Sequence, residues 1–185
     1  MALTVHNEPW QVYAENGAPL EGVSATRIDL KNNPALIIGA SHVWIWRKKG
    51  TDAEILLQRR SQLKSTWAGY LDISAAGHID AGESPVTSAI REAKEEIDID
   101  IQGEKLYYLF SLRTPLDDRE FDFVYLSQID EDIQFSFNDG EVEELLWKNL
   151  DEFEAMTKNP EKHNLVPQGE AYFLLLIAAI RRLSL

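Results

Sequence analysis

Most of the chain alternates between apolar and polar residues in short segments, a period that predicts β-strands. Ala35–Trp46 is the strongest of these segments, and β-branched and aromatic residues dominate it. The other predicted strands are Trp10–Tyr13, Glu54–Gln58, Tyr70–Ile73, Gly77–Ile79, Leu106–Leu112, Phe121–Leu126 and Val142–Trp147. Turns are expected at Glu15-Asn16-Gly17, Lys48-Lys49-Gly50 and Leu116-Asp117-Asp118. The first of these turns predicts a small N-terminal hairpin.

Helical periodicity replaces this alternation in the segments Ser84–Ile97, Leu150–Met156 and Gln168–Leu183. Strands on both sides of one central helix, followed by a terminal helix, indicate mixed α/β layers rather than a repeated βαβ pattern. No repeat, low-complexity tract or long linker divides the chain. We therefore expect one α/β (mixed α+β) domain over residues 35–185, with residues 1–34 forming an extension or hairpin packed on it.

Composition narrows the classes of function. The chain has 185 residues, 18 Lys and Arg against 31 Asp and Glu, and a net charge of −13, which disfavours binding to a nucleic-acid polymer. The absence of cysteine excludes disulfides, thiolate zinc sites and cysteine nucleophiles. Residues 1–9 lack the pattern of a secretory signal, and the apolar stretch Ala171–Ile180 is shorter than the roughly 20 residues that span a bilayer. We expect a cytoplasmic protein without a membrane partner.

The segment Gly77–Ile99 contains the candidate chemistry, and it reads GHIDAGESPVTSAIREAKEEIDI. Ser84 suits the N-cap of a helix, and Pro85 suits its first position. When the residues are projected at about 100° each, one face of the helix forms an apolar stripe that can pack on a sheet. The stripe consists of Val86, Ala89, Ile90, Ala93 and Ile97. An adjoining face gathers three acids, Glu92, Glu95 and Glu96.

Three like charges at these spacings repel one another by roughly a few tenths of a kcal/mol per pair in an isolated helix. Arg91 is the basic residue at the edge of this acidic face. Oxygen ligands in such an arrangement suit a hard divalent cation, Mg²⁺ or Mn²⁺. The alternative is an acidic helix face that water alone solvates.

This segment resembles the Nudix box, G-x5-E-x7-R-E-U-x-E-E-x-G-U, in which U is apolar. The matching residues are Gly77, Glu83, Arg91, Glu92, Ala93, Glu95, Glu96 and Ile99. Asp98 stands where the family has Gly, and Asp tolerates the left-handed backbone that a turn there requires. The resemblance implies a Nudix fold, in which a mixed sheet lies between helices and the box forms a loop–helix–loop metal site.

The resemblance also implies roles for these residues. Glu92, Glu95 and Glu96 would hold the divalent metals together with the Gly77 carbonyl, Glu83 would lie near them, and Arg91 would orient the glutamates. The implied reaction is attack of water on the phosphorus of a small diphosphate, such as a nucleoside diphosphate linked to another moiety. The general base stays open among Glu92, Glu120, Glu141 and Glu143, with Glu120 preferred downstream because it opens a predicted strand.

Four flanking segments look like the subgroup related to isopentenyl-diphosphate isomerase: Trp10–Gly17, Ile55–Arg60, Trp67–Gly77 and Arg119–Tyr125. Those isomerases carry a catalytic cysteine next to a metal-binding histidine. Here His78 is present, but alanine occupies the cysteine positions. An isomerase-like protein that acts on or binds an isoprenoid diphosphate is therefore an alternative, and a non-catalytic ligand-binding regulator is another.

Substrate contacts are expected outside the box. Arg59, Arg60 and Lys64 could bind phosphate oxygens, or they could be surface charges. Trp67 could stack on a base or an apolar moiety, or pack in the core. His78 is expected near the chemistry. His42 is interpreted as a strand histidine satisfied by a neighbour; the alternative, which the isomerase resemblance implies, is that His42 and His78 bind a metal with Glu120. Nudix proteins often dimerise, so a homodimer is a possible assembly.

Overall fold

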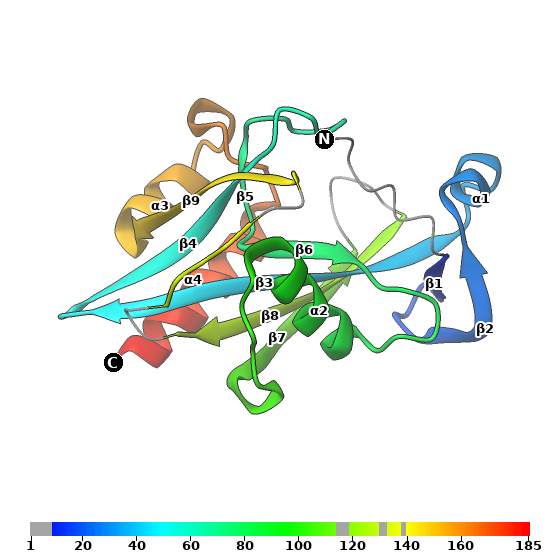
Figure 1. Cartoon of the computed structure of the whole chain (residues 1–185), viewed down its shortest axis with the longest axis horizontal. Helices are drawn as coiled ribbons and strands as arrows, with labels where there is room; N and C mark the ends of the chain where they lie inside the picture. Colours follow the sequence, from blue (N-terminus) through cyan, green and yellow to red (C-terminus); the bar gives the residue numbers. More distant parts are fainter. Residues whose placement is uncertain (1–8, 114–118, 130–132, 138–139) are drawn as a thin grey trace.

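A computed structural model describes residues 9–113, 119–129, 133–137 and 140–185 of the chain. Within these residues nine strands form one mixed sheet, with helices on both of its faces (Figure 1). The strands are β1 Trp10–Tyr13, β2 Pro19–Ala25, β3 Ile37–Lys49, β4 Asp52–Arg60, β5 Leu71–Asp72, β6 Ala75–His78, β7 Leu106–Arg113, β8 Glu120–Gln128 and β9 Val142–Asn149. The helices are α1 Arg27–Asn32, α2 Pro85–Ile97, α3 Leu150–Thr157 and α4 Glu170–Ser184, with short 3-10 turns at Gly103–Lys105 and Glu161–His163.

The long strand β3 organises the sheet. It pairs in parallel with β8 and antiparallel with β1, β4 and β6. A chain with both kinds of pairing around one strand has a mixed sheet, as the sequence predicted. The strand runs past the predicted end at Trp46 to Lys49, because Arg47, Lys48 and Lys49 continue the pairing with β4 up to the turn.

Alternating side chains of β3 enter two different cores. Trp44 and Trp46 are buried against the helices α3 and α4, together with Phe153 and Tyr172. Val43 and Ile45 are buried on the opposite face, where Ala89, Ala93 and Ile97 of α2 cover them. Both faces of β3 are therefore apolar, as expected for a central strand between two helical layers. This arrangement confirms the predicted α/β class with a mixed sheet between helices.

β1 and β2 pair as an antiparallel hairpin, and β1 joins β3, so that β2 is the edge strand of the same sheet. The sequence pattern did not predict α1, which has six residues and no buried side chain. A capping box starts this helix: the Thr26 side chain accepts from the Asp29 amide, and the Asp29 side chain accepts from the Thr26 amide. The predicted turn at Leu116-Asp117-Asp118 lies outside the described residues.

In the part of the chain that the structure describes, every helix is too short or too polar to cross a bilayer.

Candidate metal centre and active site

The helix α2 begins and ends where its sequence predicts. The Ser84 side chain accepts a hydrogen bond from the Thr87 amide, and Pro85 occupies the first turn. Asp98 follows the helix with φ 57° and ψ 37°, which is the left-handed region. Its amide donates to carbonyls of the last turn, so this non-glycine residue closes the helix in the way that glycine usually does.

The buried face of α2 is rotated toward the glutamates relative to the predicted apolar stripe. Ala89, Ala93 and Ile97 are fully buried as predicted, but Val86 is 39% exposed. Glu92 and Glu96 are instead 9% and 3% exposed and face the interior. The prediction for Val86 was wrong because it assumed that the buried face of the helix is centred on the apolar residues. In the folded protein the helix instead turns two acids, Glu92 and Glu96, toward β6.

Glu96 is held by neighbours on the sheet. Its Oε2 accepts from the Ala76 amide at 2.9 Å and from the Gln58 side chain at 3.3 Å. Glu95, by contrast, keeps 44% of its side chain exposed. Of the three acids on this face, two are therefore built into the interior and one faces solvent.

Arg91 connects the acids of the box. Its guanidinium lies 3.0 Å from Glu83, 2.5 Å from Glu92 and 3.1 Å from Glu95, measured between the nearest N and O atoms. The same guanidinium donates to the His78 carbonyl at 3.0 Å, which fixes α2 to the end of β6. Although burial opposes it, the hydrogen bonds and charges of Glu83 and Glu92 raise the pKa of Arg91. One guanidinium thus contacts three glutamates of the box, and Asp80 lies 3.7 Å from its Nε.

Gly77 faces this network from β6. A Cβ built on this residue would collide with the Glu92 carboxylate, so a side chain at position 77 requires Glu92 to move. The backbone of β6 and the Glu92 carboxylate therefore approach each other more closely than any residue other than glycine allows.

The electrostatics of the site favour a bound cation. Burial raises the pKa of Glu92 to about 7, with the charges of Glu95 and Glu141 adding to the shift and Arg91 opposing it. Burial and the Glu92 charge raise the pKa of Glu96 well above its usual range. Buried carboxylates are ionised at low cost when a cation pairs with them. The donor set consists of carboxylate oxygens beside a backbone strand, which suits Mg²⁺ or Mn²⁺ rather than a soft metal.

Lys64 and Glu141 lie beside the acidic cluster although they are distant in sequence. They form an ion pair, and the charge of Glu141 acts on both Glu92 and Glu96. Glu143, another candidate for the general base, accepts a hydrogen bond from the Gln62 side chain at 3.3 Å.

Of the other residues predicted to contact the substrate, the two arginines are in ion pairs and Trp67 is partly exposed. Arg59 pairs with Glu144 at 3.0 Å, and Arg60 pairs with the buried Asp72 at 2.8 Å. Trp67 is 37% exposed and packs edge-on against Tyr70. The loop between β4 and β5 thus presents Lys64 and Trp67, whereas the Arg60 guanidinium is committed to Asp72 and to the Thr66 carbonyl.

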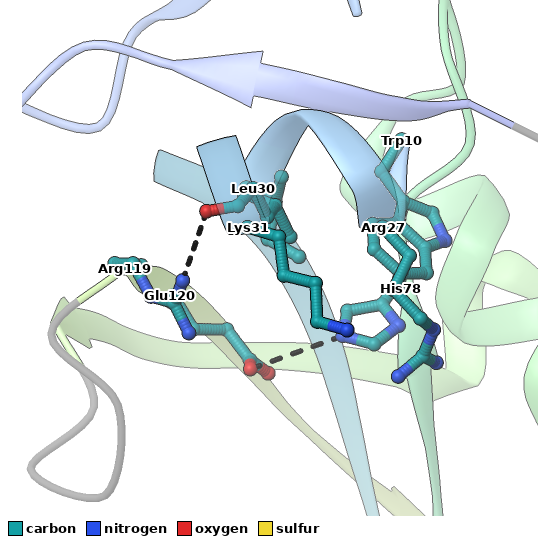
Figure 2. A pocket seen from close by; sticks show the side chains of 8 residues that line it. Trp10, Arg27, Leu30, Lys31, His78, Arg119 and Glu120 are labelled. Carbon is teal, nitrogen blue, oxygen red and sulfur yellow. Dashed lines mark hydrogen bonds and ion pairs between the residues drawn. The ribbon is translucent and has the colours of Figure 1, made fainter. Parts of the chain in front are cut away.

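His78 and Glu120 lie together at the end of the sheet, 3.9 Å apart (Figure 2). Burial and the charge of Arg27 lower the pKa of His78 to about 4, so its ring is neutral near pH 7. Glu120 thus contacts the His78 side chain. Arg91, by contrast, donates to glutamates of the box and to the His78 carbonyl.

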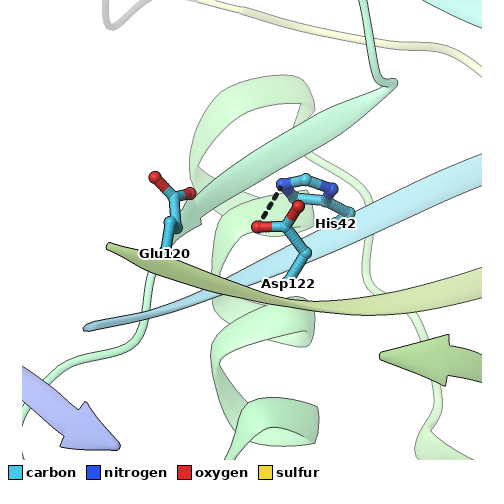
Figure 3. Close-up of side chains that lie close together, drawn as sticks. All are labelled: His42, Glu120 and Asp122. Atoms are coloured by element: carbon cyan, nitrogen blue, oxygen red, sulfur yellow. Dashed lines mark ion pairs between the residues drawn. The ribbon is translucent and has the colours of Figure 1, made fainter. Parts of the chain in front are cut away.

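A second group of ligand-type side chains is formed by His42, Glu120 and Asp122 (Figure 3), whose nearest donor atoms all lie within 4.8 Å of one another. His42 Nδ1 lies 3.0 Å from the Tyr172 hydroxyl, which confirms that a neighbour satisfies this histidine. Sequence analysis did not single out Asp122. Its signal was the period of two in Glu120-Phe121-Asp122, which places both acids on one face of β8.

Comparison with known proteins decides the family. A model of the NUDIX domain matches residues 36–169, well over half of the chain. The chain belongs to the Nudix family. An uncharacterised Nudix hydrolase of Listeria monocytogenes is 30% identical over 159 residues, which cover 83% of this chain and 87% of that protein.

Other similarities are shorter or weaker. Nudix hydrolase 3 of Arabidopsis thaliana is 42% identical over 71 residues, which are 38% of this chain but only 9% of that relative's length. A crystal structure of a Deinococcus radiodurans protein superposes with a TM-score of 0.66 at 22% identity, covering 95% of this chain and 98% of that one. This likeness shows that the two share the Nudix fold.

Proposed function

We propose that this Nudix protein is a divalent-metal-dependent hydrolase that cleaves the pyrophosphate bond of a small nucleoside diphosphate derivative. The observation that carries the proposal is the pair of buried carboxylates, Glu92 and Glu96, which Arg91 and β6 hold side by side with raised pKa values. A purely structural helix gains nothing from burying two acids without a cation between them.

In this proposal Glu92, Glu95 and Glu96 bind the metal with the Gly77 carbonyl, and Glu83 supports them through Arg91. A bound divalent cation stabilises charge on the phosphate and lowers the pKa of water. Arg91 keeps Glu83, Glu92 and Glu95 in fixed positions through ion pairs, and it forms a further, longer ion pair with Asp80 at 3.7 Å. The Ala76 amide and the Gln58 side chain fix Glu96 in the same way.

For the general base we propose Glu141 in place of Glu120. The charge of Glu141 acts on both Glu92 and Glu96, whereas Glu120 lies 3.9 Å from His78 and belongs to the group with His42 and Asp122. Lys64 orients the Glu141 carboxylate through its ion pair. We further propose that Lys64, Trp67 and Arg59 contact the substrate from the β4–β5 side, and that residues 1–34 form an extension of the Nudix domain at 35–185.

Two alternatives have weaker support. Membership of the isopentenyl-diphosphate isomerase-like subgroup remains a proposal drawn from the flanking segments, and the chain has no cysteine for proton transfer. A non-catalytic regulator would not need every glutamate of the box, and all of them are present.

The test is phosphate release, coupled to a phosphatase, from nucleotide sugars, ADP-ribose, dinucleoside polyphosphates, nucleoside triphosphates and isoprenoid diphosphates, with Mg²⁺ or Mn²⁺. We expect release from a nucleoside diphosphate derivative, lost with EDTA. Release from isoprenoid diphosphates alone would contradict the proposed substrate class, and release that survives EDTA would contradict the role of the metal.

A further inference from the structure

A pocket of about 370 Å³ lies beside α1, at the end of the sheet (Figure 2). Its walls come from α1, β1 and the ends of β6 and β8. This volume lies in the range of small-molecule sites, roughly 300–1,000 Å³. The proposed chemistry of the glutamates does not use this pocket.

Positive charge converges on the pocket. Arg27, Lys31 and Arg119 line it, against one carboxylate, that of Glu120. Figure 2 shows the side chains of Arg27 and Lys31 extending from α1 toward His78 and Glu120. The whole chain has a net charge of −13, so three of its 18 cations around one small pocket form a local reversal of charge.

The two cations on α1 are placed at a structural cost. Arg27 and Lys31 are four residues apart in a six-residue helix, a spacing at which like charges repel. The guanidinium of Arg27 lies over the Trp10 ring, 5.5 Å from its centre, and that ring in turn lies 4.3 Å from the His78 ring. Arg27 is exposed but lies over the Trp10 ring, and an anion in the pocket would offset the repulsion between the two cations.

His78 joins the pocket to the metal site. Its side chain lines the pocket, while its carbonyl accepts from Arg91 and its neighbour Gly77 contacts Glu92. His78 therefore connects the pocket to the stretch of β6 that packs against Glu92 and Arg91.

We propose that this pocket binds a phosphoryl group of the substrate other than the one that water attacks. The proposal rests on the hydrolase function proposed above. Guanidinium groups match phosphate oxygens with paired hydrogen bonds, and an ammonium adds a further point charge. The pocket selects an anion rather than a nucleobase, because Arg27 and His78 already cover the Trp10 ring. The α1 segment would then favour substrates with a second phosphoryl group within reach.

Binding of inorganic phosphate in EDTA tests the proposal without any turnover. Titration at low salt, followed by calorimetry, is expected to give saturable binding to the full chain and an affinity at least tenfold lower in the Arg27→Gln/Lys31→Gln double variant. Lys162→Gln, a change at an exposed lysine remote from the pocket residues in sequence, is the matched control and should bind phosphate as the wild type does. Absence of binding, or equal binding to the double variant, would overturn the inference.

Kinetics on whichever substrate the release screen identifies give a second measurement. We expect the double variant to raise KM at least tenfold while kcat stays within twofold of the wild type. An unchanged KM would overturn the assignment of this pocket to the substrate. Failure of the release screen would count against the hydrolase itself, whereas the phosphate titration still decides whether the pocket binds phosphate.

Discussion

At the scale of single residues, the site depends on close approaches that only certain side chains permit. Gly77 is the clearest example, because a Cβ there would occupy the space of the Glu92 carboxylate. The motif indicated a glycine at this position, but not which atom it makes room for. His78, Arg91 and Glu92 all meet at this point of β6.

Replacement of Gly77 by alanine should therefore displace Glu92. We expect Gly77→Ala to cost about 1–3 kcal/mol in the free energy of unfolding, the range for overpacked interiors, and to weaken Mg²⁺ binding. Gly103→Ala is the control, because a Cβ there meets only Ile90 at 4.0 Å. Denaturant unfolding and metal titration measure both effects, and equal behaviour of the two variants would refute the proposed contact.

The protonation of Glu92 should couple metal binding to pH. Its pKa of about 7 in the metal-free protein means that a proton and the metal compete for the same carboxylate near neutrality. We expect Mg²⁺ affinity to rise with pH from 6 to 8 and binding to release protons, as calorimetry in buffers of different ionisation enthalpy would show. In Glu92→Gln we expect a Mg²⁺ affinity that does not change with pH. If the affinity of the wild type and of the variant changes equally with pH, Glu92 is excluded as the titrating group.

At the level of helices and strands, sequence periodicity predicted where the strands and the long helices lie along the chain. It was less successful at predicting which of their side chains are buried. The central strand, the N-terminal hairpin and the helix α2 are all present where expected, because each has a strong local pattern. Three features of the structure were not predicted, because no local pattern in the sequence indicates them. The six-residue α1 has no buried face, Val86 lies off the buried side of α2, and Lys64 meets Glu141 across 77 residues of chain.

The C-terminus of α2 offers a test of element stability. Asp98 adopts a left-handed backbone, which costs a non-glycine residue roughly 1 kcal/mol. Its ion pair with Lys94 is exposed and compensates little. We therefore expect Asp98→Gly to raise the free energy of unfolding by about 0.5 kcal/mol and Asp98→Ala to lower it. Thermal unfolding of the two variants measures this, and a stabilised alanine variant would contradict the assigned backbone.

At the scale of the whole molecule, ionisable groups lie between the layers of the fold as well as at its surface. His42 and Asp122 on neighbouring strands are buried together under α4, where Trp44 donates to the Tyr172 hydroxyl that contacts His42. The sequence indicated a satisfied histidine, but its partner is 130 residues away and depends on how α4 packs on the sheet.

Acid should therefore destabilise the fold through His42. Burial lowers its pKa from 6.5 to about 4, while the charge of Asp72 opposes the shift. Between these values the unfolded chain binds a proton that the folded protein does not, so stability falls as pH drops from 6.5 toward 4, by about 3 kcal/mol in total. Glu92 and Glu96 act in the opposite direction, because their raised pKa values favour the folded state at low pH.

The contribution of His42 is isolated by comparing variants. His42→Gln should lower stability at pH 7 but lose this part of the acid dependence, measured as the difference from the wild type in urea unfolding at several pH values. A difference that stays constant from pH 7 to pH 4 would show that His42 is not the responsible group.

We propose that the buried acids of α2 form a catalytic metal site. The most direct measurement is Mg²⁺-dependent phosphate release by wild type and by Glu96→Gln, which keeps an oxygen to accept from the Ala76 amide. The matched control is Glu104→Gln, at an exposed acid of the turn Gly103–Lys105. We predict a loss of about 100-fold or more in kcat for Glu96→Gln and no change for Glu104→Gln. Equal activity of all three proteins would show that Glu96 is not part of a catalytic metal site.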